Sequence, residues 1–101
     1  MPWMIETYDK PGSGALRLEV RPEHLDYLET NKELLLACGA KLDDEGGAAS
    51  GGLYLLALET REQAQAFIAA DPFFKAGLFE RVFITRWRKA YLDGRNTLDE
   101  G

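Results

Sequence analysis

The stretch LYLLALETREQ at residues 53–63 contains a change from the pattern of a strand to the pattern of a helix, and the element order follows from it. The first six residues are apolar on both faces of an extended chain, which predicts a buried strand over Leu53–Leu58. Thr60 is followed three residues later by Gln63, a spacing typical of a capping box at the start of a helix. The stretch therefore predicts a strand that leads directly into a helix.

Downstream of this stretch, the helix that begins at Thr60 ends at Asp71. The next residue is Pro72, and a residue that precedes proline disfavours helical geometry. A last strand is predicted over Arg81–Trp87, where aromatic and β-branched side chains return. The polar chain after Lys89 is expected to fray, apart from Tyr91 and Leu92.

Upstream, three elements and a glycine-rich loop precede the stretch. Pro22 suits the first turn of a helix, and Gly39 is a natural stop. The glycine-rich residues 45–52, which include Ser50, are expected to form a loop. The predicted elements are a strand over Trp3–Tyr8, a helix over Pro22–Ala37 and a short strand over Ala40–Asp44.

The element order is thus β-α-β-β-α-β, the ferredoxin-like α+β arrangement with a four-stranded antiparallel sheet. All 101 residues are expected to form a single domain. Two helices cover only one face of such a sheet, yet the strands carry apolar side chains on both faces. An uncovered apolar face usually marks an interface, so we expect a homodimer that packs sheet against sheet. The alternative is a monomer whose tail folds over the sheet.

Charge and cysteine content exclude several classes of protein. The net charge is −5, from 17 acidic and 12 basic residues, which argues against nucleic acid as a partner. No apolar run approaches the roughly 20 residues of a membrane span, and residues 1–5 do not resemble a signal peptide. We therefore expect a cytoplasmic protein that is not bound to a membrane.

Cys38 is the only cysteine, and His24 is the only histidine. They supply too few ligands for an iron–sulfur cluster or for a common structural zinc site. We expect no metal and no cofactor. Cys38 falls at the end of the predicted first helix, where a buried structural thiol is more typical than a reactive one.

His24 and Asp71 are the candidate acid–base residues. In this topology, the start of the first helix, the end of the second helix and the turn between the two central strands lie at one edge of the sheet. His24, Asp71 and the loop around Ser50 are therefore expected to converge there. Histidine titrates near neutral pH, and a carboxylate beside it would orient its ring. The competing interpretation is a surface histidine and an aspartate that only terminates a helix.

Three further residues are candidate ligand contacts. Arg17 and Arg21 lie between the first strand and the helix, and the guanidinium of either suits an anionic substrate such as a carboxylate, although an ordinary surface charge is the alternative. Ser50 is not surrounded by a nucleophile-elbow or phosphate-loop pattern, so we expect only a hydrogen bond to a ligand. The acidic run at residues 43–45 is interpreted as a solvated turn and not as a cation site.

Several short motifs occur together in order, and the chain resembles a YciI-like (YCII-related domain) protein from Trp3 to about Lys89. The segments that carry the resemblance are residues 21–25 (RPEHL), the glycine-rich turn before Leu53, residues 62–67 and residues 71–78 (DPFFKAGL). The resemblance implies a dimeric α+β barrel and a His–Asp pair at His24 and Asp71. The resemblance extends to a chlorohydroxyquinol dehydrochlorinase and, more distantly, to muconolactone isomerase-like folds.

These observations predict a small-molecule enzyme that transfers protons in an isomerisation or elimination. His24 would be the base or acid, Asp71 would orient it, and Arg17 and Ser50 would contact the ligand. The alternative is a non-catalytic dimer that binds a small ligand or regulates another protein. Residues 9–15 and 88–101 diverge from the resemblance and could border the pocket, so the substrate of a relative does not transfer to this chain.

Overall fold

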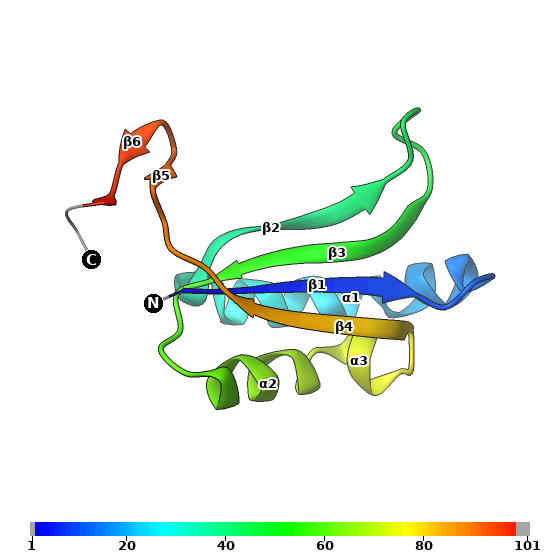
Figure 1. The fold of residues 1–101 in the computed structure, drawn as a ribbon. Coiled ribbons are helices and arrows are strands. Elements are labelled where there is room, and N and C mark those ends of the chain that lie inside the picture. Colours follow the sequence, from blue (N-terminus) through cyan, green and yellow to red (C-terminus); the bar gives the residue numbers. More distant parts are fainter. Residues whose placement is uncertain (1, 99–101) are drawn as a thin grey trace.

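The computed structural model describes residues 2–98 and has the predicted ferredoxin-like topology (Figure 1). One antiparallel sheet has the strand order β2-β3-β1-β4. Its strands are β1 (Trp3–Asp9), β2 (Leu35–Leu42), β3 (Ala49–Leu56) and β4 (Phe79–Arg86). One face of the sheet is covered by α1 (Gly14–Thr30), α2 (Arg61–Ala69) and the single turn α3 (Pro72–Lys75). A short 3-10 turn, η1 (Lys32–Leu34), links α1 to β2.

The core lies between the sheet and the helices. Alternate residues of β1 and β3 point toward the helices and are buried, as the pleat requires. The buried cluster consists of Trp3, Ile5, Tyr54, Leu56, Ala64, Phe67 and Ile68. These side chains hold α2 and β3 in fixed positions, and the candidate site depends on both.

The start of α2 confirms the capping box. The Gln63 backbone N–H donates to the Thr60 hydroxyl at 3.1 Å, and the Thr60 backbone N–H donates to Gln63 Oε1 at 3.1 Å. At the other end, Asp71 is not the last residue of α2 but the N-cap of α3, with Pro72 at its first position. Proline therefore both ends one helix and starts the next.

The boundaries of the first helix and of β2 differ from the prediction. α1 spans Gly14–Thr30 and contains Pro22 in its interior, so proline does not mark its start. Residues 35–38, predicted to be helical, belong to β2 and pair with β3. The hydrogen bonds and packing of this pairing override the helical spacing of the leucines. The strand is therefore Leu35–Leu42 and not Ala40–Asp44.

The turn after β2 is shorter than expected, and the later strands are shifted. The Asp43 carboxylate accepts from the backbone N–H groups of Gly47 and Ala48, which closes the turn. β3 begins at Ala49, so Ser50 lies in a strand and not in a loop. β4 spans Phe79–Arg86, two residues earlier at its start than predicted.

Tyr91 and Leu92 are ordered as expected, but the expectation of a frayed tail is wrong for residues 93–97. Residues 91–96 form a hairpin of β5 (Tyr91–Leu92) and β6 (Arg95–Asn96). Its turn residues Asp93 and Gly94 both have positive φ, as a tight hairpin turn requires. Figure 1 shows the hairpin projecting away from the sheet. The end of the predicted tail, residues 99–101, lies outside the described residues.

The second face of the sheet is not covered by a helix. It is a mixed surface: Leu53 and Phe83 are exposed, whereas Lys41 and Glu6 form an ion pair at 3.3 Å. The Lys41 ammonium also lies 3.2 Å from the centre of the Tyr8 ring. Within residues 2–98, no helix combines the length and apolar character needed to cross a membrane.

A close approach of β1 and β3 predicts a specific intolerance at Gly51. A Cβ there would collide with the carbonyl group of Thr7, whereas a Cβ at Gly39 would meet nothing within 4 Å. We expect Gly51→Ala to lower the free energy of unfolding by about 2 kcal/mol or more, because the backbone must shift. The matched control Gly39→Ala should leave it unchanged or slightly raised. Urea denaturation measures both, and equal stabilities of the two variants would contradict the geometry.

Candidate active site

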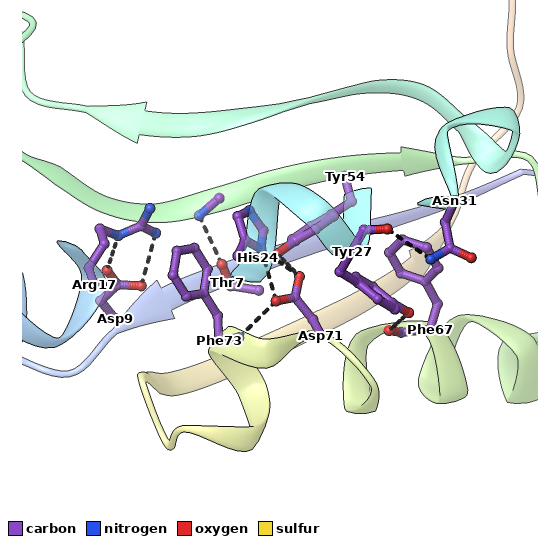
Figure 2. Close-up of polar contacts among 11 residues, drawn as sticks. Thr7, Asp9, Arg17, His24, Tyr27, Asn31, Tyr54, Phe67, Asp71 and Phe73 are labelled. Carbon is purple, nitrogen blue, oxygen red and sulfur yellow. Dashed lines mark hydrogen bonds and ion pairs between the residues drawn. The ribbon is translucent and has the colours of Figure 1, made fainter. Parts of the chain in front are cut away.

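His24 and Asp71 are in direct contact. The Nδ1 atom of His24 lies 2.9 Å from both carboxylate oxygens of Asp71 (Figure 2). His24 projects from the middle of α1, not from its first turn as predicted, and Asp71 caps α3. Both residues are buried. The two residues, 47 positions apart in the sequence, thus meet between the helices and the sheet.

Asp71 is fully buried and accepts hydrogen bonds from two further groups. The backbone N–H of Phe73 donates to Oδ1 at 2.8 Å, and the Tyr54 hydroxyl donates to Oδ2 at 2.9 Å. Burial raises the pKa of Tyr54, and the negative charge of Asp71 raises it further, so the phenol keeps its proton. Sequence reasoning placed Tyr54 only on a face of the strand and missed this contact.

The carboxylate of Asp71 determines which nitrogen of His24 carries hydrogen. A carboxylate only accepts hydrogen bonds, so its contact with His24 requires a hydrogen on Nδ1. The other ring nitrogen, Nε2, makes no hydrogen bond to the described residues and is not among their fully buried polar atoms. The arrangement leaves Nε2 free to accept or give a proton.

Phe73 connects His24 to Arg17. Its ring stacks on the imidazole with centroids 3.9 Å apart and an interplanar angle of 16°. The Arg17 guanidinium lies 4.7 Å from the centre of the same ring. Figure 2 shows Phe73 between the two side chains. Arg17 is itself held by Asp9, with Nε 2.7 Å and Nη2 3.3 Å from the carboxylate oxygens.

A cavity of about 200 Å³ opens beside His24. Small residues of β2 and β3 form part of its wall, which leaves space between these strands and α1. The lining residues are Arg17, Arg21, His24, Leu25, Leu28, Cys38, Gly39, Ala40, Gly51, Gly52, Tyr54 and Phe73. Helix α1 therefore brings both arginines and the histidine to one cavity.

Ser50 does not line this cavity. It is exposed near the start of β3 and borders a separate hollow formed with residues 9–14. Arg21, the second arginine expected to be able to hold an anionic substrate, lies at the cavity instead. Its position agrees with the spacing, because Arg17, Arg21 and His24 are four and three residues apart and share one side of a helix.

The predicted position and burial of Cys38 are wrong. The residue lies in β2 instead of at a helix end, and it is exposed at the cavity wall. Neighbouring protein atoms reduce the hydration of the thiol, which raises its pKa. The negative charge of Asp71 raises the pKa further, to about 11. At neutral pH the group is a thiol and a poor nucleophile. Within residues 2–98, no group of three or more His, Cys, Asp or Glu side chains is arranged to hold a metal.

Fold and site define a small ferredoxin-like α+β protein with a buried His–Asp pair beside a cavity. The model of the YCII-related domain family matches residues 1–88, and the chain belongs to this family. It is similar to Protein YciI from Escherichia coli O6:H1, with 35% identity over 98 residues that cover 90% of this chain and 100% of that protein. The same identity and coverage apply to Protein YciI from Shigella flexneri.

Two solved structures extend the comparison. The chain resembles 5-chloro-2-hydroxyhydroquinone dehydrochlorinase (TftG) from Burkholderia phenoliruptrix AC1100, solved in complex with 2,5-dihydroxybenzoquinone. The TM-score is 0.82 at 32% identity, covering 87% of this chain and 94% of that one. The NE2512 protein of unknown function from Nitrosomonas europaea has a TM-score of 0.51 at 22% identity, with coverage of 90% and 91%, and shares the fold alone.

The Tyr54–Asp71 contact leads to a pH-dependent prediction. Tyr54→Phe should lower the free energy of unfolding at pH 7 by about 1.5–3 kcal/mol, because a donor to a buried carboxylate is lost. The pKa of Tyr54 is raised on folding, so its contribution is present below about pH 10 and is lost as the pH rises further. The stability difference between wild type and variant should therefore shrink above pH 10.

Urea denaturation at pH 7, 9 and 10.5 measures this difference. Tyr91→Phe is the matched control, since Tyr91 is 64% exposed in the hairpin. A gap between wild type and Tyr54→Phe that stays constant across this range would contradict the inferred protonation of Tyr54.

Proposed function

We propose that the chain is a small-molecule enzyme that uses His24 and Asp71 for proton transfer, in an isomerisation or an elimination. The observation that carries the proposal is the 2.9 Å contact between His24 Nδ1 and a fully buried carboxylate, with Nε2 unpaired beside a cavity. A histidine held in one tautomer, with its second nitrogen free, is the arrangement that general acid–base catalysis needs.

The proton-transfer step follows from this arrangement. Nε2 accepts a proton from an acidic C–H or O–H bond of the substrate, and Asp71 stabilises the resulting imidazolium. In an elimination, the electron pair of the broken bond forms a double bond while the leaving group departs with its own pair. In an isomerisation, Nε2 returns the proton to another atom of the substrate. Cys38 takes no part, because its thiol keeps its proton.

The dehydrochlorinase relative supports this class of reaction. Its name describes loss of hydrogen chloride from a hydroxylated ring, and its structure holds a dihydroxybenzoquinone. A cavity of roughly 150 Å³ accommodates a benzene ring, so the cavity of about 200 Å³ here fits one substituted ring. We propose a small, hydroxylated aromatic or carboxylated compound as the substrate.

Substitution of either member of the pair should abolish most of the turnover. His24→Gln and Asp71→Asn should each reduce kcat/KM by about 10²–10⁴-fold, the usual contribution of a general base. Asp26→Asn is the matched control, because Asp26 is an exposed carboxylate on the same helix as His24. The measurement is turnover of a panel of hydroxylated aromatics and lactones.

The outcomes of this panel separate the two interpretations. Turnover by wild type that persists undiminished in His24→Gln would contradict the catalytic proposal. Binding of panel members without any turnover would favour the alternative, a ligand-binding or regulatory protein. Circular dichroism of each variant shows whether a loss of activity reflects a loss of folding.

We also propose a homodimer that packs through the open face of the sheet, in the cytoplasm. Leu53 and Phe83 are exposed on this face, and burying them against a second copy would remove apolar surface from water. The unpaired Cys38 suits a reducing compartment.

A charge on the open face tests the dimer. Phe83 and Phe74 are 47% and 44% exposed, but Phe74 lies on α3, away from this face. Phe83→Glu should weaken the dimer at least about tenfold, because a carboxylate would be buried, whereas Phe74→Glu should leave it intact. Light scattering after gel filtration gives the mass. A wild-type mass of one 11.3 kDa chain at all concentrations would refute the proposal.

A further inference from the structure

A second, larger cavity continues from the one beside His24. Its volume is about 420 Å³, and it shares Arg17, Arg21 and Ala40 with the inner cavity. Its lining consists of Gly14, Arg17, Leu18, Arg21, Ala40, Leu42, Gly47, Ala48 and Ala49. The two cavities are therefore successive sections of one groove that follows α1 along β2.

The groove is continuous because of the residues on either side. On α1, Arg17, Arg21, His24 and Leu28 recur every three or four residues and share one side of the helix. On the opposite side, β2 and the turn after it contribute glycine and alanine at most positions. These short side chains leave room between the helix and the edge strand.

The two arginines at the junction differ in whether their side chains are already paired. Arg17 is paired with Asp9 through two hydrogen bonds. Arg21 is exposed, and the part of the chain that the structure describes contains no ion pair or hydrogen bond partner for its side chain. Neither cavity is lined by an acidic residue, although the chain carries a net charge of −5. An unpaired guanidinium in such surroundings suits a carboxylate, which it binds through two parallel hydrogen bonds.

The outer section beyond the arginines is apolar. Leu18 on α1 and Leu42 on β2 contribute to its walls, and they are 72% and 54% exposed. The inner cavity alone is smaller than the roughly 300–1,000 Å³ of typical ligand sites. The outer section, about twice as large, brings the groove into that range. The volume and the lining indicate a ligand longer than one ring.

We propose that the ligand of this site is an amphipathic carboxylate. Its carboxylate pairs with Arg21 at the junction, its reacting end lies beside His24, and its hydrocarbon substituent lies between Leu18 and Leu42. The assignment of the reacting end rests on the proposed function. The binding mode does not, since it depends only on the groove and on the unpaired guanidinium.

A series of 4-alkylbenzoates tests the hydrocarbon section. Benzoate, 4-propylbenzoate and 4-hexylbenzoate are titrated below their micelle concentrations, with binding followed by calorimetry. We expect affinity to rise about tenfold or more from benzoate to 4-hexylbenzoate, as methylene groups leave water. In the double variant Leu18→Asn, Leu42→Asn, this gain should disappear while benzoate binds unchanged. Leu98→Asn is the matched control, because Leu98 is 52% exposed and lies after the hairpin.

Neutral analogues test the carboxylate contact. Arg21→Gln should weaken the binding of 4-hexylbenzoate about tenfold and leave the binding of 4-hexylbenzyl alcohol unchanged, because only the carboxylate pairs with the guanidinium. Arg88→Gln, at an exposed arginine that lines neither cavity, is the control.

Different results would contradict the catalytic proposal and the proposal of an amphipathic carboxylate ligand. Equal affinity for all three benzoates, or a gain with chain length that survives the leucine substitutions, overturns the amphipathic ligand even where His24→Gln abolishes turnover. If Arg21→Gln loses the same affinity for the acid as for the alcohol, the proposed carboxylate contact is overturned. If instead the expected binding pattern is found and His24→Gln leaves turnover intact, only the catalytic proposal falls.

Discussion

The structure depends on the way in which the buried carboxylate of Asp71 is hydrogen-bonded by other groups of the protein. A buried carboxylate without partners costs several kcal/mol, and here it accepts from His24, Tyr54 and the backbone of Phe73. The three donors come from α1, β3 and α3, so one side chain ties two layers together. The same bonds hold the imidazole in one orientation. Structural stability and the proposed acid–base chemistry therefore have a single physical origin.

The order of the elements and the meeting of His24 with Asp71 could be predicted from sequence, even though the first helix was misplaced. The capping box at Thr60 and the proline at position 72 are local signals, and local signals survive folding. The start of α1 could not be found in the same way, because Pro22 is tolerated inside the helix. His24 and Asp71 are close together as predicted, although Ser50 is not, because strand order determines which layer each helix joins, whatever its exact ends.

Ser50 and the choice between Arg17 and Arg21 show where such reasoning fails. The ligand contact expected at Ser50 required a long glycine-rich loop, but pairing with β2 extends β3 back to Ala49. At about 3.3 Å per residue, Ser50 then lies roughly 13 Å along the strand from Tyr54. Arg21 resembles any surface arginine until the structure shows that Asp9 pairs with Arg17 and leaves its neighbour unpaired. Such pairings arise from tertiary geometry, which spacing in a single sequence does not contain.

The site divides into a rigid part and an open part, and the division has a physical basis. The inner end is tied to buried groups, so a substitution there disturbs the core as well as the chemistry. The outer end is formed by exposed leucines and by small residues near the turn after β2, where most surface substitutions cost little stability. Changes at Leu18 or Leu42 can therefore alter which ligand fits while the pair at the other end of the groove stays intact. The fold thereby separates what determines the reaction from what determines the ligand.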